Sequence, residues 1–156
     1  MTRASARELR IAAVCLINRV RAGWGLPPVA QRLQLDLAAQ GHSVEMVLND
    51  NFSHNGPGRT GPGARVDRAG FRWSELGEAI STGLPTPAKL VAGWLSDTYH
   101  CQILLSPTYR LVGIGVSRGE VRGYANQPGT WTADMALGAG SRPPSGNWGP
   151  ADGCPH

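Results

Sequence analysis

Apolar residues recur at helical spacing in the first third of the chain and alternate in the last third, which predicts helices first and strands last. Leu9, Leu16 and their apolar neighbours share one face, so we expect an amphipathic helix that ends near Gly23. A second helix is expected over residues 30–48, with His42 on or near its inner stripe. A buried histidine that bonds a backbone carbonyl is more common than a ligand, and this is the interpretation we favour for His42.

The middle of the chain is richer in turn-forming residues. Asn, Gly, Pro and Ser crowd residues 49–63, which predicts a surface loop with His54 near its start. A short helix over residues 64–69 should follow it. The loop contains neither the phosphate-binding P-loop pattern nor the glycine fingerprint of dinucleotide-binding folds. We therefore exclude nucleotide binding.

The segment Thr86–Thr98 has the strongest helical signal of the chain. Thr86 can cap the helix and the proline after it suits a first turn. Asp97 follows Trp94 by three residues and should lie at the edge of the apolar stripe, where a carboxylate is costly without a partner. His100 would be its neighbour if the helix continued, which makes a functional site plausible.

Alternation of apolar residues predicts three strands, near residues 111–116, 121–126 and 130–135. The connections are short, so the three strands should form an antiparallel meander. Gly113 and Gly115 would leave one face of the first strand bare, open to close approach by another element or a ligand. The pattern as a whole predicts an α+β domain over residues 1–137. The Gly-, Pro- and Ser-rich residues 138–156 are expected to be a flexible tail.

The composition of this chain of 156 residues limits the kinds of partner that we expect for it. Hydrophobic residues make up 41% and charged residues 17%, which is typical of a folded domain. No stretch is apolar enough to span a bilayer, and the apolar residues 11–17 run directly into Asn18 and Arg19, so no signal peptide is visible. The net charge of +4 comes from scattered arginines without a basic run, which argues against nucleic acid and favours weak attraction to an anionic cell surface.

Three cysteines leave at least one thiol outside any intramolecular disulfide. Cys15 lies in the apolar first helix and Cys101 lies beside His100, so we expect both near the core. A Cys15–Cys101 disulfide is one hypothesis, and two buried free thiols are the other. Cys154 lies in the predicted tail, and we interpret it together with His156 as too weak a pair for a metal site.

Four polar residues are the candidates for a functional site, and each lies in a recognisable short sequence motif: His54, Glu78, Asp97 and His100. Two imidazoles and two carboxylates that met in one pocket could bind a divalent metal or a polar ligand.

Several short motifs, in order along nearly the whole predicted domain, resemble the bacterial CAP superfamily (cysteine-rich secretory proteins, antigen 5 and pathogenesis-related 1 proteins; SCP-like domains). The motifs are Asn18-Arg19-Val20-Arg21, Gly25-Leu26-Pro27-Pro28, Phe52-Ser53-His54, Gly77-Glu78, Trp94, His100 with Ile103-Leu104, Val112-Gly113-Ile114-Gly115-Val116 and Trp131-Thr132-Ala133-Asp134. The resemblance implies an α-β-α sandwich with a small three-stranded antiparallel sheet between helices. It also implies a cavity tetrad that falls on His54, Glu78, Asp97 and His100, with zinc or another divalent ion as a cofactor in some members, and an extracellular or envelope location.

Three functions are compatible with these residues. The first is a non-enzymatic, exported binding module for a small apolar ligand, a lipid or a cell-envelope component. The second is a metal-dependent peptidase or esterase in which His54, His100 and either Glu78 or Asp97 hold the ion. The third is a structural domain of envelope or spore assembly. The sequence leaves the oligomeric state open.

Overall fold

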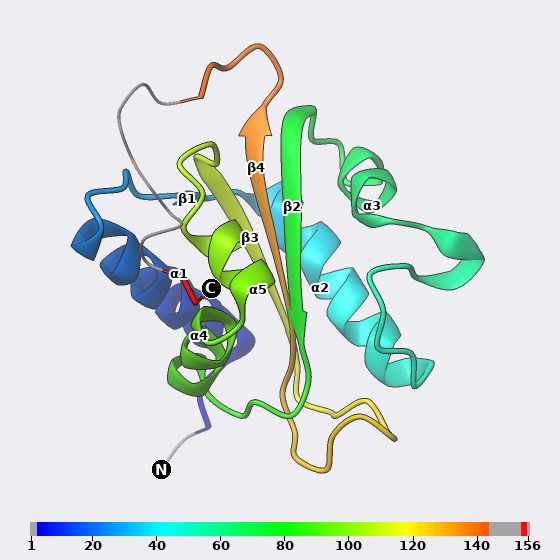
Figure 1. Ribbon diagram of the computed structural model, residues 1–156. Helices are drawn as coiled ribbons and strands as arrows, with labels where there is room; N and C mark the ends of the chain where they lie inside the picture. The colour runs from blue at the N-terminus through cyan, green and yellow to red at the C-terminus, as the bar shows by residue number, and fades with distance from the viewer. Residues whose placement is uncertain (1–2, 144–153, 156) are drawn as a thin grey trace.

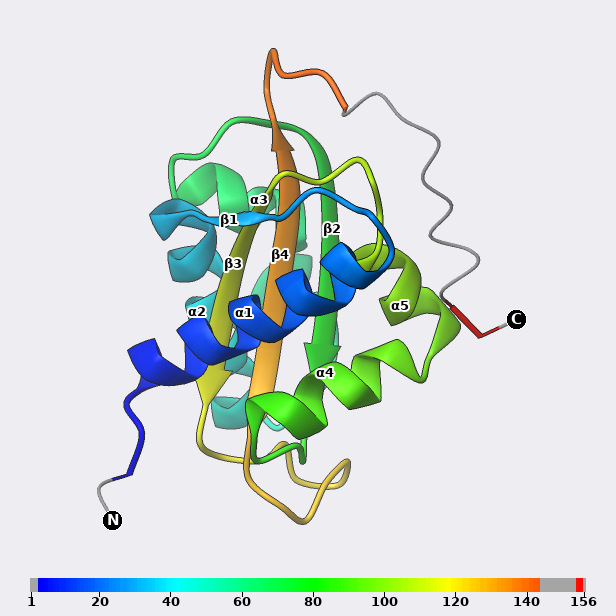
Figure 2. The ribbon, with the colours of Figure 1, turned by 90° about the vertical axis from the view of Figure 1, so that its left-hand side faces the viewer.

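A four-stranded sheet separates two layers of helices in the computed structural model, which describes residues 3–143 and 154–155 (Figure 1). The strands are β1 (Ala30–Gln31), β2 (Trp73–Ser81), β3 (Leu111–Ser117) and β4 (Thr130–Gly138). The helices are α1 (Ala6–Gly23), α2 (Leu33–Leu48), α3 (Pro62–Arg68), α4 (Pro87–Leu95) and α5 (Thr98–Leu104), with a 3-10 turn η1 at Pro57–Arg59. Figure 2 shows α1 and α4 on one face of the sheet and α2 and α3 on the other. The α-β-α sandwich and the α+β class are therefore confirmed.

The sheet is mixed, which corrects the expected three-stranded antiparallel meander. Its strand order is β1-β3-β4-β2, with β1 parallel to β3 and the other pairs antiparallel. Residues 121–126 form turns, because the amides of Tyr124 and Ala125 both donate to the Val121 carbonyl. The missed strand is β2, whose buried Glu78 interrupts the apolar alternation that would have revealed it.

Helix α2 lies directly on β3, as the bare face at Gly113 and Gly115 predicted. A Cβ atom at either glycine would collide with the α2 backbone. Beyond the two-residue β1, polar side chains of α2 take over the pairing with β3. Asp36 accepts a hydrogen bond from the Ile114 amide, and Gln40 bonds both the amide and the carbonyl of Val116. These bonds leave no free edge along this part of β3.

Helix α1 is fixed at both ends by side-chain hydrogen bonds. Ser5 and Glu8 form a capping box at its start. Near its end, Arg21 is fully buried and donates to the carbonyls of Pro27, Leu104, Ser106 and Tyr109. Burial lowers the pKa of Arg21 to about 10. This guanidinium ties α1 to the loop after it and to the segment between α5 and β3.

The expected helix Thr86–Thr98 is two helices. Thr86 caps α4 as predicted by accepting from the Lys89 amide, but α4 ends at Leu95. Asp97 then caps α5 by accepting from the His100 amide at 2.9 Å. The Asp97 side chain is 54% exposed, so it does not lie on an apolar stripe, and that expectation was wrong.

The hypothesis of a Cys15–Cys101 disulfide is also wrong, and so is the alternative of two buried free thiols. Cys101 is bonded to Cys154, with a Cα–Cα distance of 5.6 Å, and Cys15 is an exposed free thiol. Cys15 projects from the solvent side of α1, because its helix is amphipathic and only the opposite face packs on the sheet. The bond attaches residue 154 to the domain. Most of the predicted tail, including His156, lies outside the described residues.

Candidate functional site

The four candidate residues fall into two pairs beside a single tyrosine. His54, in the segment after α2, bonds Glu78 of β2, and Asp97 bonds His100 at the start of α5. The ring of Tyr99 lies 6.3 Å from the His54 ring and 5.4 Å from the His100 ring, measured between centroids. The structure thus brings both imidazoles to one place, while the two carboxylates stay apart in different networks.

Glu78 is the centre of the first pair and is 4% exposed. Its Oε1 accepts a hydrogen bond from His54 Nδ1 at 2.8 Å, and its Oε2 accepts one from an Arg65 terminal nitrogen at 2.7 Å. Arg65 reaches Glu78 from α3, which lies between the loop and β2. Both oxygens of Glu78 are therefore already used within the protein.

Asp134 is a buried acid directly beside Glu78. The two residues are paired across β2 and β4, so their side chains leave the same face of the sheet. Asp134 is 0% exposed and no donor within the described residues reaches either of its oxygens. An ionised carboxylate in that position would be uncompensated. A protonated Asp134 satisfies the geometry, because its hydroxyl can donate to the Glu78 carboxylate.

The pKa values of the two acids diverge for this reason. Burial raises the pKa of Asp134 well above its ordinary value, and the negative charge and hydrogen bond of Glu78 raise it further. Burial also acts to raise the pKa of Glu78, but hydrogen bonds from His54 and Asp134 and the charges of Arg65 and His42 outweigh it. The pKa of Glu78 is therefore held below its usual range.

His42 of α2 completes the buried network. Its Nε2 lies 2.8 Å from the Ser53 carbonyl, as the favoured interpretation of a carbonyl-bonded histidine predicted. Its Nδ1 lies 3.2 Å from Glu45, and Nε2 is also 3.9 Å from Glu78. Both ring nitrogens of His42 therefore face oxygen atoms of the protein.

The charges of the network favour the same protonation state of Asp134. Arg65 and Glu78 form a buried ion pair, which a neutral Asp134 leaves balanced, whereas an ionised Asp134 would add a second buried negative charge beside Glu78. Charge balance and hydrogen bonding therefore agree.

His100 faces a different environment from His54. Burial lowers the pKa of His100 and repulsion from the nearby His54 lowers it further, while Asp97 opposes both. Asp97 itself has a lowered pKa, chiefly because it accepts the His100 amide. Burial thus outweighs Asp97, and the lowered pKa of His100 favours a neutral imidazole.

Two hollows adjoin the Tyr99–His100 segment. One, of about 430 Å³, is lined by His54, Glu78 and Tyr99 together with Trp73, Leu76 and other neighbours. The second, of about 340 Å³, is lined by Asp97 and His100 with a mostly apolar and aromatic wall: Phe52, Ile80, Leu84, Trp94 and Tyr124. Tyr99 and Tyr124 are 57% and 63% exposed, so large aromatic surfaces stand at the rims.

Glu78 is not free to bind a divalent metal in this arrangement. His54 Nδ1 and both oxygens of Glu78 are engaged with one another and with Arg65. Within residues 3–143 and 154–155, no three His, Cys, Asp or Glu side chains are placed to hold an ion together. A metal ligand set that included Glu78 would need Glu78 to release Arg65 or His54.

Sequence reasoning missed two members of the network and the aromatic residue between the pairs: Arg65, Asp134 and Tyr99. The sequence did offer a clue to Asp134, because an acid in the middle of a predicted core strand requires a partner. It offered no clue to Arg65, since an arginine in a short helix after a loop is usually solvated. Tyr99 directly precedes the candidate His100, but its place between the two histidines depends on the break between α4 and α5.

Comparison with known proteins gives matches that cover most of the domain. The sequence model described as the Cysteine-rich secretory protein family (CAP) matches residues 14–135. An uncharacterized membrane protein, YlbC, of Bacillus subtilis (strain 168) is 29% identical over 103 residues, which are 66% of this chain and 30% of that protein. The chain thus spans about a third of the length of that curated relative.

Solved structures share the fold. An extracellular protein of Bacillus anthracis that contains an SCP domain superposes with a TM-score of 0.70 at 22% identity, over 87% of this chain and 45% of that one. An outer surface protein of Borrelia burgdorferi superposes with a TM-score of 0.75 at 14% identity, over 88% of this chain and 98% of that one. No helix among the described residues is long and apolar enough to cross a membrane.

Proposed function

Since the chain belongs to the cysteine-rich secretory protein (CAP) family, we propose that it is a non-enzymatic binding module of the bacterial cell surface or exterior. Its similarity to a protein described as extracellular and to an outer surface protein supports this location. The ligand would be a small, largely apolar molecule such as a fatty acid or another lipid component of the envelope.

The observation that carries the proposal is the pair of hollows that adjoin the Tyr99–His100 segment. Their volumes, about 340 and 430 Å³, are those of small-molecule sites, and their walls are aromatic and aliphatic with few polar groups. Exposed Tyr99 and Tyr124 present apolar rings with a polar tip, which suits a ligand that has one wet end. His100, kept neutral by its surroundings, could bond that end.

The closed network behind the hollows argues for binding rather than catalysis. A catalytic carboxylate needs a free oxygen toward its substrate. Both oxygens of Glu78 are held by His54 and Arg65 instead, and Asp134 is inaccessible. These groups are arranged to hold the wall of the site in place.

A titration with a fluorescent fatty acid, read by its own emission, tests the proposal. We expect saturable binding that Tyr99→Ala weakens by about tenfold, because a large apolar contact at the rim is removed. Leu48→Ala, at an exposed apolar side chain at the end of α2, is the matched control and should bind like the wild type. Absence of saturable binding, or equal affinity in both variants, would contradict a ligand site beside Tyr99.

The metal-dependent hydrolase is a second hypothesis, favoured only by the approach of His54 and His100 to the same ring. With Glu78 as the carboxylate ligand, it requires Glu78 to exchange a protein partner for the ion. Zinc content after dialysis, compared between wild type and His54→Ala, tests it, together with esterase and peptidase assays of both proteins. Equal zinc content and equal activity would eliminate it. The structural-domain hypothesis predicts instead that substitutions in the network change the melting temperature without changing ligand binding.

A further inference from the structure

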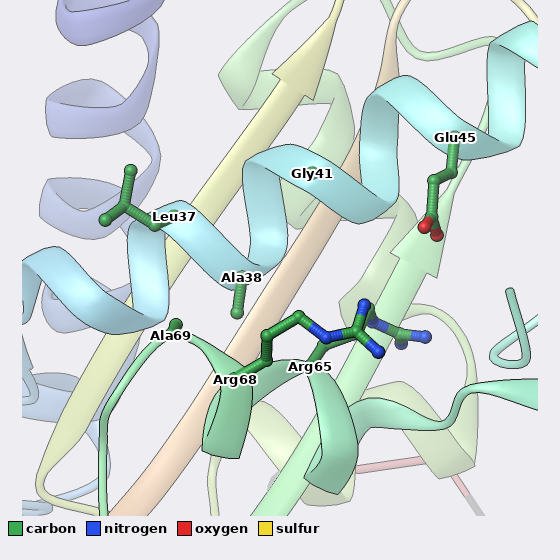
Figure 3. A pocket seen from close by; sticks show the side chains of 7 residues that line it. All are labelled: Leu37, Ala38, Gly41, Glu45, Arg65, Arg68 and Ala69. Carbon is green, nitrogen blue, oxygen red and sulfur yellow. The ribbon is translucent and has the colours of Figure 1, made fainter.

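A separate pocket of about 260 Å³ lies between α2 and α3 (Figure 3). Small apolar residues form much of its wall, and it is also lined by three charged residues. Its lining comprises Leu37, Ala38, Gly41 and Glu45 from α2 and Arg65, Arg68 and Ala69 from α3 and its end. None of these residues lines either of the two hollows at the Tyr99–His100 segment.

Two guanidinium groups share this pocket. Figure 3 shows the Arg65 and Arg68 side chains rising from α3 toward α2, with the Glu45 carboxylate descending toward them. Arg65 has 5% of its side chain exposed, and its Nε is buried with no acceptor among the described residues. Arg68 is exposed and forms no ion pair within the described part of the chain. The pocket therefore contains donors without acceptors.

The charges around the pocket leave one cation unbalanced. Arg65 is neutralised by Glu78 at 2.7 Å, and Glu45 is engaged by the His42 ring at 3.2 Å. Arg68 has no such counterpart in the described residues, although it lies beside a second guanidinium. Two like charges in a partly closed pocket repel each other more strongly than they would in water. An anion between them would remove that cost.

We propose that the pocket between α2 and α3 binds a small organic carboxylate. Its carboxylate accepts hydrogen bonds from the exposed guanidinium of Arg68. Its short apolar body rests against Ala38, Gly41 and Ala69. This site is distinct from the hollows beside Tyr99, and its ligand need not be the same molecule.

The chemistry of the pocket favours a carboxylate of this kind. A planar guanidinium matches a carboxylate through paired hydrogen bonds. A single negative charge offsets the single unbalanced cation, whereas a doubly charged phosphate would leave an excess opposite Glu45. The bare surface at Gly41, where nothing lies within 4 Å of a hypothetical Cβ, and the methyl groups of Ala38 and Ala69 give an apolar body a flat floor.

An NMR titration of the whole protein with benzoate and with butanoate tests this proposal. We expect saturable amide shifts centred on Ala38, Gly41 and Ala69, and we expect the uncharged amide benzamide to bind at least about tenfold more weakly than benzoate. Arg68→Gln should weaken benzoate binding by a similar factor. Lys89→Gln removes an exposed cation from α4, in the other helix layer, and should leave the affinity unchanged.

The Tyr99→Ala variant separates this site from the proposed ligand site. Benzoate binding between α2 and α3 should persist in that variant, whatever becomes of fatty-acid binding. The proposal is overturned if neither acid gives saturable shifts or if Arg68→Gln binds benzoate as tightly as wild type. Shifts centred on Tyr99 and His100, or equal affinity for benzamide, would also overturn it. Amide spectra of each variant confirm that it is folded.

Discussion

Replacing Asp134 by asparagine should make the protein progressively more stable than wild type as the pH rises. Asp134 is fully buried beside Glu78, and burial followed by the charge of Glu78 raises its pKa well above the ordinary value. An asparagine fills nearly the same volume, can donate its amide hydrogen to the Glu78 carboxylate, and does not ionise. The substitution therefore keeps the hydrogen bond and removes the titration.

The magnitude follows from proton linkage. An aspartate in the unfolded chain loses its proton near pH 3.9. Above that pH, and up to the raised pKa in the folded state, the folded wild type binds one more proton at Asp134 than the unfolded chain does. The free energy of unfolding then falls by about 1.4 kcal/mol for each pH unit. Glu78, whose pKa is lowered, contributes the opposite dependence, lost on acidification, but it is present in both proteins and largely cancels in their difference.

Urea unfolding of both proteins at unit steps of pH, from about 5 to about 8, measures that difference. We expect the variant to gain about 1.4 kcal/mol per unit relative to wild type, until a plateau marks the folded-state pKa of Asp134. Glu75→Gln, at an exposed acid on the strand of Glu78, controls for the loss of one negative charge. A stability difference that stays constant over the whole range would refute the protonated Asp134 and the charge balance built on it.

Three substitutions test the packing that supports the site. Cys154→Ser should cost about 4 kcal/mol of unfolding free energy, because its bond to Cys101 closes a loop with a sequence separation of 53. Cys15→Ser should change the unfolding free energy by less than about 0.5 kcal/mol, and urea unfolding with and without reductant checks both variants. Arg21→Leu leaves four carbonyls without their donor and should cost about 3 kcal/mol or more in the same assay; a loss below about 1 kcal/mol would show that water replaces it. Gly113→Ala forces a methyl group into the α2 backbone, so we expect a loss of about 1–3 kcal/mol in thermal unfolding, and an unchanged melting temperature would contradict the close helix–sheet contact.

The helical half of the fold was predictable because its signals are local. The cap at Thr86, the amphipathic face of the first helix and the bare face at Gly113 each depend on residues within a turn or two of one another. The strand β2 was not predictable from alternation, since Glu78 occupies a core position that only Arg65 and His54 make tolerable. Long-range partners of this kind leave no periodic signal.

The candidate site was predicted only in part for the same reason. The motifs placed His54 and His100 in one region, and the structure sets both against Tyr99. The role of Asp97 was not predictable from helical spacing, because a helix boundary turns a residue at an apolar edge into an exposed cap. The disulfide prediction failed similarly, since the partner of Cys101 is Cys154, which lies far along the chain and outside the predicted domain.

The close contact between α2 and the sheet is what makes the polar network possible. Without side chains at Gly113 and Gly115, the helix approaches β3 closely enough for His42 to reach the region of Glu78 and for Ser43 to bond Thr132. The same approach removes water from around Asp134, which forces that acid to keep its proton. Arg65 belongs to two parts of this arrangement: its terminal nitrogen neutralises Glu78, and its side chain lines the pocket between α2 and α3. The buried network and that pocket therefore share one side chain.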